Sequence, residues 1–336
     1  MNVGIMGMGT YIPDHFMTAA DIAAKTDIPE HIIQEKFGVY RKPVPGPGDT
    51  TSVMGRKAAL KAIEHAGIDP GVIDLVIWNG AQHKDYPCWL AGLAIAEEIG
   101  AVHAWSFDME AMCGSMMAAL DTAKSIMLAK PKVNTVLIVS GYRNADLIDL
   151  SVPDTRFMLD LGAGGSAVVL RKNHDRNLIL ESSFKGDGSF ARDCIVPVLG
   201  TEAWPPEKND LSHAHFEVAD SDAFKKKLGE RTLPNFFDVV RESLADSGYT
   251  QDDIDYLAIL HFKKSAHDAV LAELGLSDEQ TTYLDQYGHI GQNDQILSLE
   301  LGIQSGRLKD GDLTVLVGAG LGFVWASTVV RWGAAL

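Results

Sequence analysis

Residues 66–80 read AGIDPGVIDLVIWNG, and residues 247–261 read SGYTQDDIDYLAILH. Each segment has a small residue and a glycine typical of a helix end, then an Ile-Asp pair and an apolar run of strand type. A second match follows in the same order, because NTVLIVSG (134–141) resembles DLTVLVGAG (312–320). Ordered internal matches indicate two copies of one folding unit. We therefore predict two duplicated halves, residues 1–172 and 173–336.

Apolar runs of strand length alternate with helical patterns along the whole chain. Alternation of this kind is typical of an α/β fold whose sheets are largely buried. The runs that predict strands are 75–78, 135–139, 166–170, 256–260, 313–317 and 324–330.

Composition narrows the class of protein. The 336 residues are 46% hydrophobic and 22% charged, as in ordinary globular proteins. We find no apolar run of the roughly 18 residues that span a bilayer, and no signal-peptide pattern at the start, so we expect a cytoplasmic protein. The formal net charge of −16 argues against binding to nucleic acid or to an anionic membrane.

The distribution of cysteine and histidine argues against a metal site. Cys88, Cys113 and Cys194 are far apart, so they form neither a disulfide framework nor a CxxC pair. The pairs His213/His215 and His261/His267 lack a third ligand at suitable spacing, and we predict that the protein binds no metal.

The segment VGIMGMG (3–9) raises the possibility of a dinucleotide-binding site, because it resembles a strand that enters a glycine-rich turn. The fingerprint requires a third glycine at position 12 and a helix that opens there. Position 12 is Ile and position 13 is Pro, so a buried strand with close glycine packing is the better interpretation. A nicotinamide-dependent dehydrogenase would show itself by binding the cofactor in a fluorescence titration.

The segment MEAMCGSMMAAL (109–120) contains the residue of greatest chemical interest, Cys113. We predict a strand over 101–108 and an apolar helix over 115–128, which places Cys113 on the turn between them. Free N–H groups and the dipole at a helix N-terminus lower the pKa of a thiol and can hold an oxyanion. The alternative is a small buried residue in a tight turn.

Two histidines of the second half fall where they could meet this thiol. His261 ends a predicted strand, and His289 lies in QYGHIGQND just ahead of a predicted helix over 296–301. Loop histidines often have no chemical role, but cysteine paired with histidine is the combination used in covalent acyl transfer.

Seven motifs, spread nearly from end to end, resemble the β-ketoacyl-ACP synthase III branch of the thiolase superfamily. They are IMGMGTYIP, FDMEAMCGSMMAAL, LDLGAGGSAVVL, GDGS (186–189), DDIDYLAILH, YGHIG and GDLTVLVGAGLGFVWASTVVRW. The resemblance implies a thiolase-like five-layer α-β-α-β-α fold of two duplicated halves, usually as a homodimer.

The resemblance also implies the chemistry. Cys113 corresponds to the acyl-accepting nucleophile, His261 and His289 to its catalytic partners, and the main-chain N–H groups of Cys113 and Leu321 to the oxyanion hole. An acyl-CoA acylates the cysteine, and a malonyl thioester, carried by CoA or an acyl carrier protein, then loses CO2 and condenses to a 3-oxoacyl thioester. Coenzyme A thioesters are substrates here, and no cofactor is implied. Fatty-acid or polyketide biosynthesis is the implied setting.

Departures from the family pattern mark a divergent member. Phe-Lys-Lys follows His261 where the family has Gln-Ala-Asn, and His289 replaces the family's asparagine, which makes a Cys-His-His set. This leaves open acyl transfer without decarboxylation, thioester hydrolysis, or a non-catalytic subunit of a thiolase-like complex.

Substrate and carrier contacts are also predicted by correspondence. His31 stands where some members have a CoA-stacking tryptophan, and Arg156 lies next to the position of a phosphate-contacting arginine. Lysines near the expected entrance are suited to an acidic carrier or its phosphopantetheine, although a solvated charge run explains them equally well. They are Lys225, Lys263 and Lys264.

Overall fold

The computed structural model of the chain describes residues 1–205 and 210–334. One mixed sheet has the strand order β11-β12-β13-β8-β1-β7-β6-β4-β5, and two-stranded ribbons pair β2 with β3 and β9 with β10. The strands are β1 (Val3–Tyr11), β2 (His15–Thr18), β3 (Arg41–Val44), β4 (Leu75–Gly80), β5 (Trp105–Glu110), β6 (Thr135–Tyr142), β7 (Gly164–Lys172), β8 (Arg176–Gly186), β9 (Cys194–Ile195), β10 (Glu217–Val218), β11 (Tyr256–Ile259), β12 (Leu313–Gly320) and β13 (Val324–Ala334).

The large sheet has a repeated plan. β4 pairs in parallel with β6, and β6 pairs antiparallel with β7. In the same way β11 pairs in parallel with β12, and β12 antiparallel with β13. A single residue pair, Gly4 with Leu178, joins β1 to β8 between these two groups of strands. The predicted boundary between residues 172 and 173 falls at the end of β7, and the division into two halves stays an interpretation of this plan.

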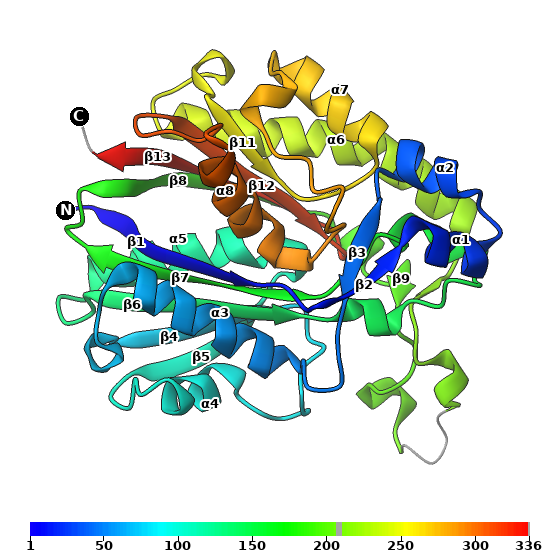
Figure 1. Cartoon of the computed structure of the whole chain (residues 1–336), viewed down its shortest axis with the longest axis horizontal. Coiled ribbons are helices and arrows are strands. Elements are labelled where there is room, and N and C mark those ends of the chain that lie inside the picture. Colours follow the sequence, from blue (N-terminus) through cyan, green and yellow to red (C-terminus); the bar gives the residue numbers. More distant parts are fainter. Residues whose placement is uncertain (206–209, 335–336) are drawn as a thin grey trace.

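Helices cover both outer faces of the strand groups and fill the space between them (Figure 1). The helices are α1 (Ala19–Thr26), α2 (Glu30–Ile32), α3 (Thr51–Ala66), α4 (Ala91–Glu98), α5 (Ser115–Ala129), α6 (Ser221–Asp246), α7 (Lys264–Leu274) and α8 (Asp294–Ser305). Because side chains of a strand alternate between its faces, Leu75 of β4 packs in the middle core with α5 and α8, and Val76 packs outward with α3 and α4. Leu257 of β11 packs outward in the same way with α6 and α7. The layers α-β-α-β-α are those that the resemblance implied.

Glycines in β1 allow α3 to lie directly on the strand. A Cβ at Gly7 would stand 2.4 Å from the carbonyl oxygen of Ala62, and one at Gly9 would stand 2.6 Å from that of Ala58. β1 continues to Tyr11 as a strand. The interpretation as a buried strand with close glycine packing is therefore confirmed over a dinucleotide turn.

The strand predicted over 101–108 was placed too early. β5 begins only at Trp105, because the preceding residues form the turn that closes α4. The Ala101 N–H donates to the carbonyl of Ala96, and the Ala104 N–H donates to that of Ala101. The helix predicted over 115–128 is α5.

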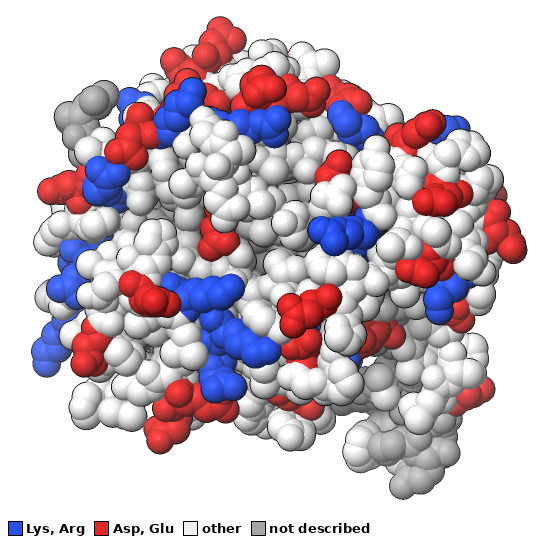
Figure 2. Space-filling model, in the orientation of Figure 1, with Lys and Arg blue, Asp and Glu red and all other residues white. Residues whose placement is uncertain are grey.

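Charged side chains of both signs are interspersed over the face that Figure 2 shows. Among the helices of residues 1–205 and 210–334, none is both long and apolar enough to cross a membrane.

Candidate active site

Cys113 lies on the tight helical turn Met112–Gly114 between β5 and α5. Met112 has a φ of 50°, a backbone conformation that is strained for a residue with a side chain and that is often found at functional sites. The Ser115 hydroxyl fixes the turn, since it donates to the Met112 carbonyl (2.6 Å) and accepts from the Ala111 N–H (2.8 Å). The predicted position of the cysteine, between a strand and the first residue of a helix, is confirmed.

Glycines at the end of β12 bring the C-terminal strands against the cysteine. A Cβ at Gly320 would stand 2.7 Å from the Cys113 backbone nitrogen, and one at Gly318 would stand 3.0 Å from the Cys113 carbonyl oxygen. Only glycine allows this approach of one backbone to another. The next residue, Leu321, directs its side chain into the core beneath α6 and α7. An oxyanion hole built from the N–H groups of Cys113 and Leu321 stays a prediction.

His289 lies on a loop that docks onto the N-terminal strands. Its N–H donates to the Asp160 carbonyl (2.9 Å), and its carbonyl accepts from the Gly162 N–H (2.8 Å). The glycines of YGHIG are required by geometry, because Gly288 and Gly291 have φ values of 59° and 68°. The loop therefore holds the His289 ring at a position set by backbone contacts across the molecule.

The His289 side chain connects Cys113 to a buried carboxylate. Its Nε2 lies 3.1 Å from the Cys113 Sγ, and its Nδ1 donates to Asp294 Oδ2 at 2.6 Å. Asp294, at the first turn of α8, also accepts from the Ile290 N–H (2.8 Å) and the His261 N–H (2.7 Å). This is the arrangement of nucleophile, base and orienting carboxylate that activates a thiol.

The surroundings of His289 favour its protonated form. Burial lowers the pKa of the ring, but the Asp294 carboxylate and Cys113 raise it by more, so the pKa of His289 lies well above its ordinary value. A proton taken up by the ring is therefore well held on Nε2.

His261 does not face the cysteine. Its ring is buried, its Nδ1 donates to Asp160 Oδ2 (2.8 Å), and its Nε2 donates to the Gly38 carbonyl (3.1 Å). The polar contacts of both ring nitrogens are therefore made with Asp160 and Gly38, and neither is made with Cys113. The Tyr283 ring lies 5.0 Å from the His261 ring, centroid to centroid, and donates its O–H to the Phe262 carbonyl. Both nitrogens of the His261 ring therefore already have partners, and neither partner is the Cys113 thiol.

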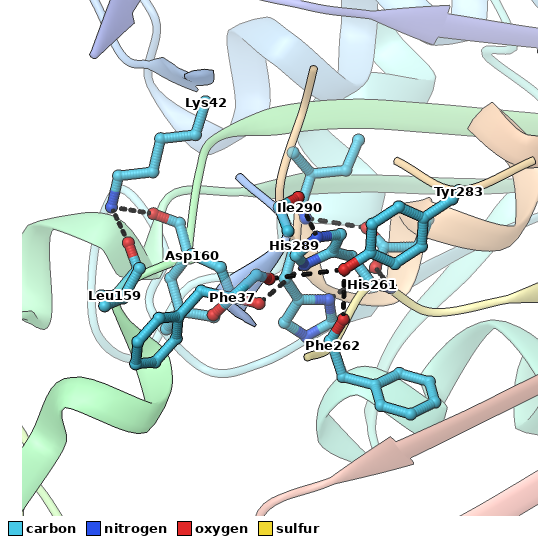
Figure 3. A network of polar contacts seen from close by, with 12 residues as sticks. Phe37, Lys42, Leu159, Asp160, His261, Phe262, Tyr283, His289 and Ile290 are labelled. Atoms are coloured by element: carbon cyan, nitrogen blue, oxygen red, sulfur yellow. Dashed lines mark hydrogen bonds and ion pairs between the residues drawn. The ribbon is translucent and has the colours of Figure 1, made fainter. Parts of the chain in front are cut away.

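Lys42 and Asp160 belong to the same network of polar contacts as His261 and His289 (Figure 3). The Lys42 ammonium is buried and donates to the carbonyls of Leu159 (2.7 Å) and Leu161 (2.8 Å), on either side of Asp160. Burial lowers the pKa of Lys42 to about 8, against the opposing effect of Asp160. Burial raises the pKa of Asp160, but His261, His289 and Lys42 lower it by more, so its pKa lies below the ordinary value and it is the carboxylate.

The residues predicted to bind substrate or carrier lie at different depths. His31 is exposed on α2, and Lys225 is exposed on α6. The Nε of Arg156 is buried without a hydrogen-bond partner.

The lysines that follow Phe262 lie over aromatic rings. Lys263 lies 5.2 Å from the centroid of the Phe37 ring. Lys264 lies 5.4 Å from the centroid of the Tyr283 ring and pairs with Asp268. Lys263, just before α7, and Lys264, its first residue, therefore lie beside aromatic rings near His261.

Four residues of the site were missed in the sequence: Lys42, Asp160, Asp294 and Tyr142, whose ring centroid lies 6.1 Å from that of His289. Tyr142 ends β6, at the carboxyl edge where Gly80 of β4 and Glu110 of β5 also end. The position after a buried parallel strand is a signal that could have identified Tyr142. Asp294 follows His289 by five residues, at the start of the predicted helix, whereas Lys42 and Asp160 carry no local signal.

Two family profiles match the chain over the segments that carry the cysteine and the histidines. The profile described as 3-Oxoacyl-[acyl-carrier-protein (ACP)] synthase III matches residues 107–188, and the profile of its C-terminal part matches residues 244–332.

Similar proteins cover nearly the full length. The β-ketoacyl-[acyl-carrier-protein] synthase III of Brucella canis is 27% identical over 334 residues, 98% of both chains. The solved 3-oxoacyl-[acyl-carrier-protein] synthase III of Aquifex aeolicus superposes with a TM-score of 0.85 at 21% identity, over 98% of this chain and 100% of that one. OleA of Xanthomonas campestris, solved with lauric acid and lauroyl-CoA, gives a TM-score of 0.82 at 20% identity over 99% of both chains.

Proposed function

The chain belongs to the 3-oxoacyl-[acyl-carrier-protein] synthase III family of thiolase-like condensing enzymes, and on that premise we propose that it carries acyl groups as a thioester on Cys113. The observation that carries the proposal is the contact series from Cys113 Sγ through the His289 ring to Asp294. Helix α5 begins two residues after the cysteine and adds free N–H groups beside Sγ.

In the first half-reaction the Cys113 thiolate attacks the carbonyl carbon of an acyl-CoA. The Sγ–C bond forms, the bond from that carbon to the CoA sulfur breaks, and the imidazolium of His289 supplies the proton to the leaving thiolate. Asp294 holds the ring so that Nε2 stays toward sulfur throughout. A positioned acid-base group of this kind typically contributes about 10²–10⁴ in rate.

In the second half-reaction we propose decarboxylative condensation with a malonyl thioester, on CoA or an acyl carrier protein. Loss of CO2 leaves an enolate whose carbon attacks the acyl-enzyme carbonyl, and the product is a 3-oxoacyl thioester. Lys263 and Lys264, with Arg156, suit the anionic groups of CoA or a carrier.

One observation favours a second candidate, acyl transfer to a hydroxyl or amine without decarboxylation. His261 is held by Asp160 and Gly38, so one imidazole reaches Sγ, in the relay used by many acyl transferases. Release of CO2 from a malonyl thioester by acylated enzyme separates condensation from this transfer.

We also propose a homodimer in which β5 pairs with its counterpart. β5 is the last strand of the large sheet and pairs along one side with β4. Its Trp105 is exposed, as expected of a surface that a second copy covers. Light scattering of the purified protein tests this directly.

The test of the proposed function is the intact mass of the protein after incubation with a panel of acyl-CoAs. Wild type is expected to gain one acyl group, and Cys113→Ala none. Cys88→Ala and Cys194→Ala are matched controls that should acylate normally, because Cys88 is exposed and burial raises the pKa of Cys194 to about 12. An unmodified wild type would contradict the proposal and would favour a non-catalytic subunit.

A further inference from the structure

A buried lysine lies behind the segment that carries Asp160. Lys42 is a residue of β3, is almost completely buried, and has no place in the contact series that reaches the thiol. Its Nζ donates to the carbonyl of Leu159 at 2.7 Å and to that of Leu161 at 2.8 Å. Burial of an ammonium is unfavourable unless hydrogen bonds compensate it, and these two bonds do so here. The lysine therefore holds the backbone on either side of Asp160.

The carbonyl between these two bonds instead to the loop that carries His289. The His289 N–H donates to the Asp160 carbonyl at 2.9 Å, and the Gly162 N–H donates to the His289 carbonyl at 2.8 Å. Residues Leu161 and His289 form an isolated parallel bridge. Lys42 and His289 thus bind neighbouring carbonyls of one short segment, and Figure 3 shows Asp160 between them.

The lysine side chain also lies close to the His289 loop itself. Gly288 has a φ of 59°, and a Cβ there would stand 2.3 Å from the Asp160 carbonyl oxygen and 3.3 Å from the Lys42 Cβ. Only glycine allows the loop to lie this close to both residues. The ammonium of Lys42 therefore holds the segment on which the loop docks, and its stem lies beside the loop.

We infer that Lys42 is a positioning residue, whose ammonium fixes residues 159–161 and, through them, the direction of the His289 ring toward the Cys113 sulfur. Lys42 acts through His289 and transfers no proton. The distance of 3.1 Å from Nε2 to Sγ allows little displacement, since a misplacement of about 1 Å can cost about 10²-fold in rate. For its effect on acyl transfer this inference rests on the proposed function.

The test compares two buried lysines of the same kind. Lys42→Met removes the ammonium and keeps an unbranched apolar side chain. Lys42→Gln, which is shorter than lysine by one bond, is the second variant should Lys42→Met not fold. The matched control is Lys172→Met, because Lys172 is also buried and its Nζ donates to the carbonyls of Lys130 (2.9 Å) and Pro131 (3.5 Å), at the end of α5 that is far from Cys113.

Two quantities are measured for each variant. One is the pH profile of Cys113 alkylation by iodoacetamide, which requires no acyl substrate and is read on the Cys113 peptide because Cys88 is exposed. The other is the rate of Cys113 acylation by an acyl-CoA. Both measurements are repeated in a His289→Asn background, because a residue that acts through the His289 ring has nothing to position once the ring is removed.

We expect Lys42→Met to move the alkylation profile to higher pH and to slow acylation by about 10–10²-fold, as for a displacement of up to about 1 Å. Lys172→Met should match wild type in both quantities, and in the His289→Asn background Lys42→Met should change neither.

An unshifted alkylation profile in Lys42→Met would overturn the inference while the proposed function stands. An equal shift in Lys172→Met, or a shift that persists in the His289→Asn background, would overturn it as well. If wild type is never acylated, the proposed function fails, and the alkylation profiles still decide whether Lys42 positions His289.

Discussion

Two buried aspartate–histidine pairs lie side by side in this molecule and differ in what the far ring nitrogen meets. In the Asp294–His289 pair, Nδ1 donates at 2.6 Å and Nε2 lies 3.1 Å from the Cys113 sulfur. In the Asp160–His261 pair, Nδ1 donates at 2.8 Å and Nε2 donates to the Gly38 carbonyl at 3.1 Å. A thiol can exchange a proton with the ring, whereas a carbonyl oxygen can only accept a hydrogen bond from it. The same pair of residues therefore contacts the nucleophile in one place and the backbone in the other.

The carboxylates give the largest expected contrast. Asp294→Asn should slow acylation of Cys113 by about 10²–10⁴-fold, since an amide no longer holds the ring as a base toward sulfur. Asp160→Asn should leave the acylation rate near wild type, because its histidine does not contact the thiol. Rapid-quench mass spectrometry with one acyl-CoA measures both acylation rates. Equal losses of rate in the two variants would contradict different roles for the two carboxylates.

The Asp160–His261 contact should contribute to stability. Asp160→Asn and His261→Asn each remove one partner of this buried polar contact, so each should lower the free energy of unfolding. The double variant should lose less than the sum of the two, with a coupling of about 0.5–3 kcal/mol from the lost contact. Urea unfolding of the four proteins measures the coupling. Strictly additive losses would mean that the two side chains do not stabilise one another.

The last expected effect is a pH dependence that belongs to Lys42. Burial lowers its pKa to about 8 in the folded protein from 10.5, so between these pH values the unfolded chain binds more protons than the folded one. Stability therefore rises with pH across that window, by at most about 1.4 kcal/mol per pH unit from this group. Lys42→Met should remove that part of the rise in urea unfolding between pH 7 and 11. A rise of equal slope in the variant would assign it to other groups.

The elements of the fold were predictable because burial leaves a direct mark on sequence. The β4 and β11 segments are apolar on both faces, because each strand lies between helical layers. The sequence match between these segments, in the same order as the second match, indicated the duplication. The position of Cys113 on a turn ahead of a helix was predictable for a similar reason, because a glycine and then a run of small and apolar residues at helical spacing follow it directly. The late start of β5 was not, since a turn held by Ala96 and Ala101 resembles a strand in composition.

Ring orientation was not predictable, because it depends on partners distant in sequence. Spacing placed His261 and His289 on loops after strands, and both loops do reach one region. The direction of His261 is set by Asp160 and Gly38, and Gly38 itself must be glycine because a Cβ there would stand 1.9 Å from the Tyr283 hydroxyl. Contacts of that kind join separate segments and leave no periodic pattern in the chain.

The central claim is that His289, and not His261, serves the Cys113 thiol. The most direct test measures single-turnover acylation of Cys113 by intact mass in two matched variants, His289→Asn and His261→Asn, since each replaces an imidazole by an amide that cannot take up a proton. We predict that His289→Asn acylates about 10²–10⁴-fold more slowly than wild type and that His261→Asn, once shown to be folded, acylates near the wild-type rate. Fast acylation by His289→Asn together with slow acylation by His261→Asn would contradict the assignment.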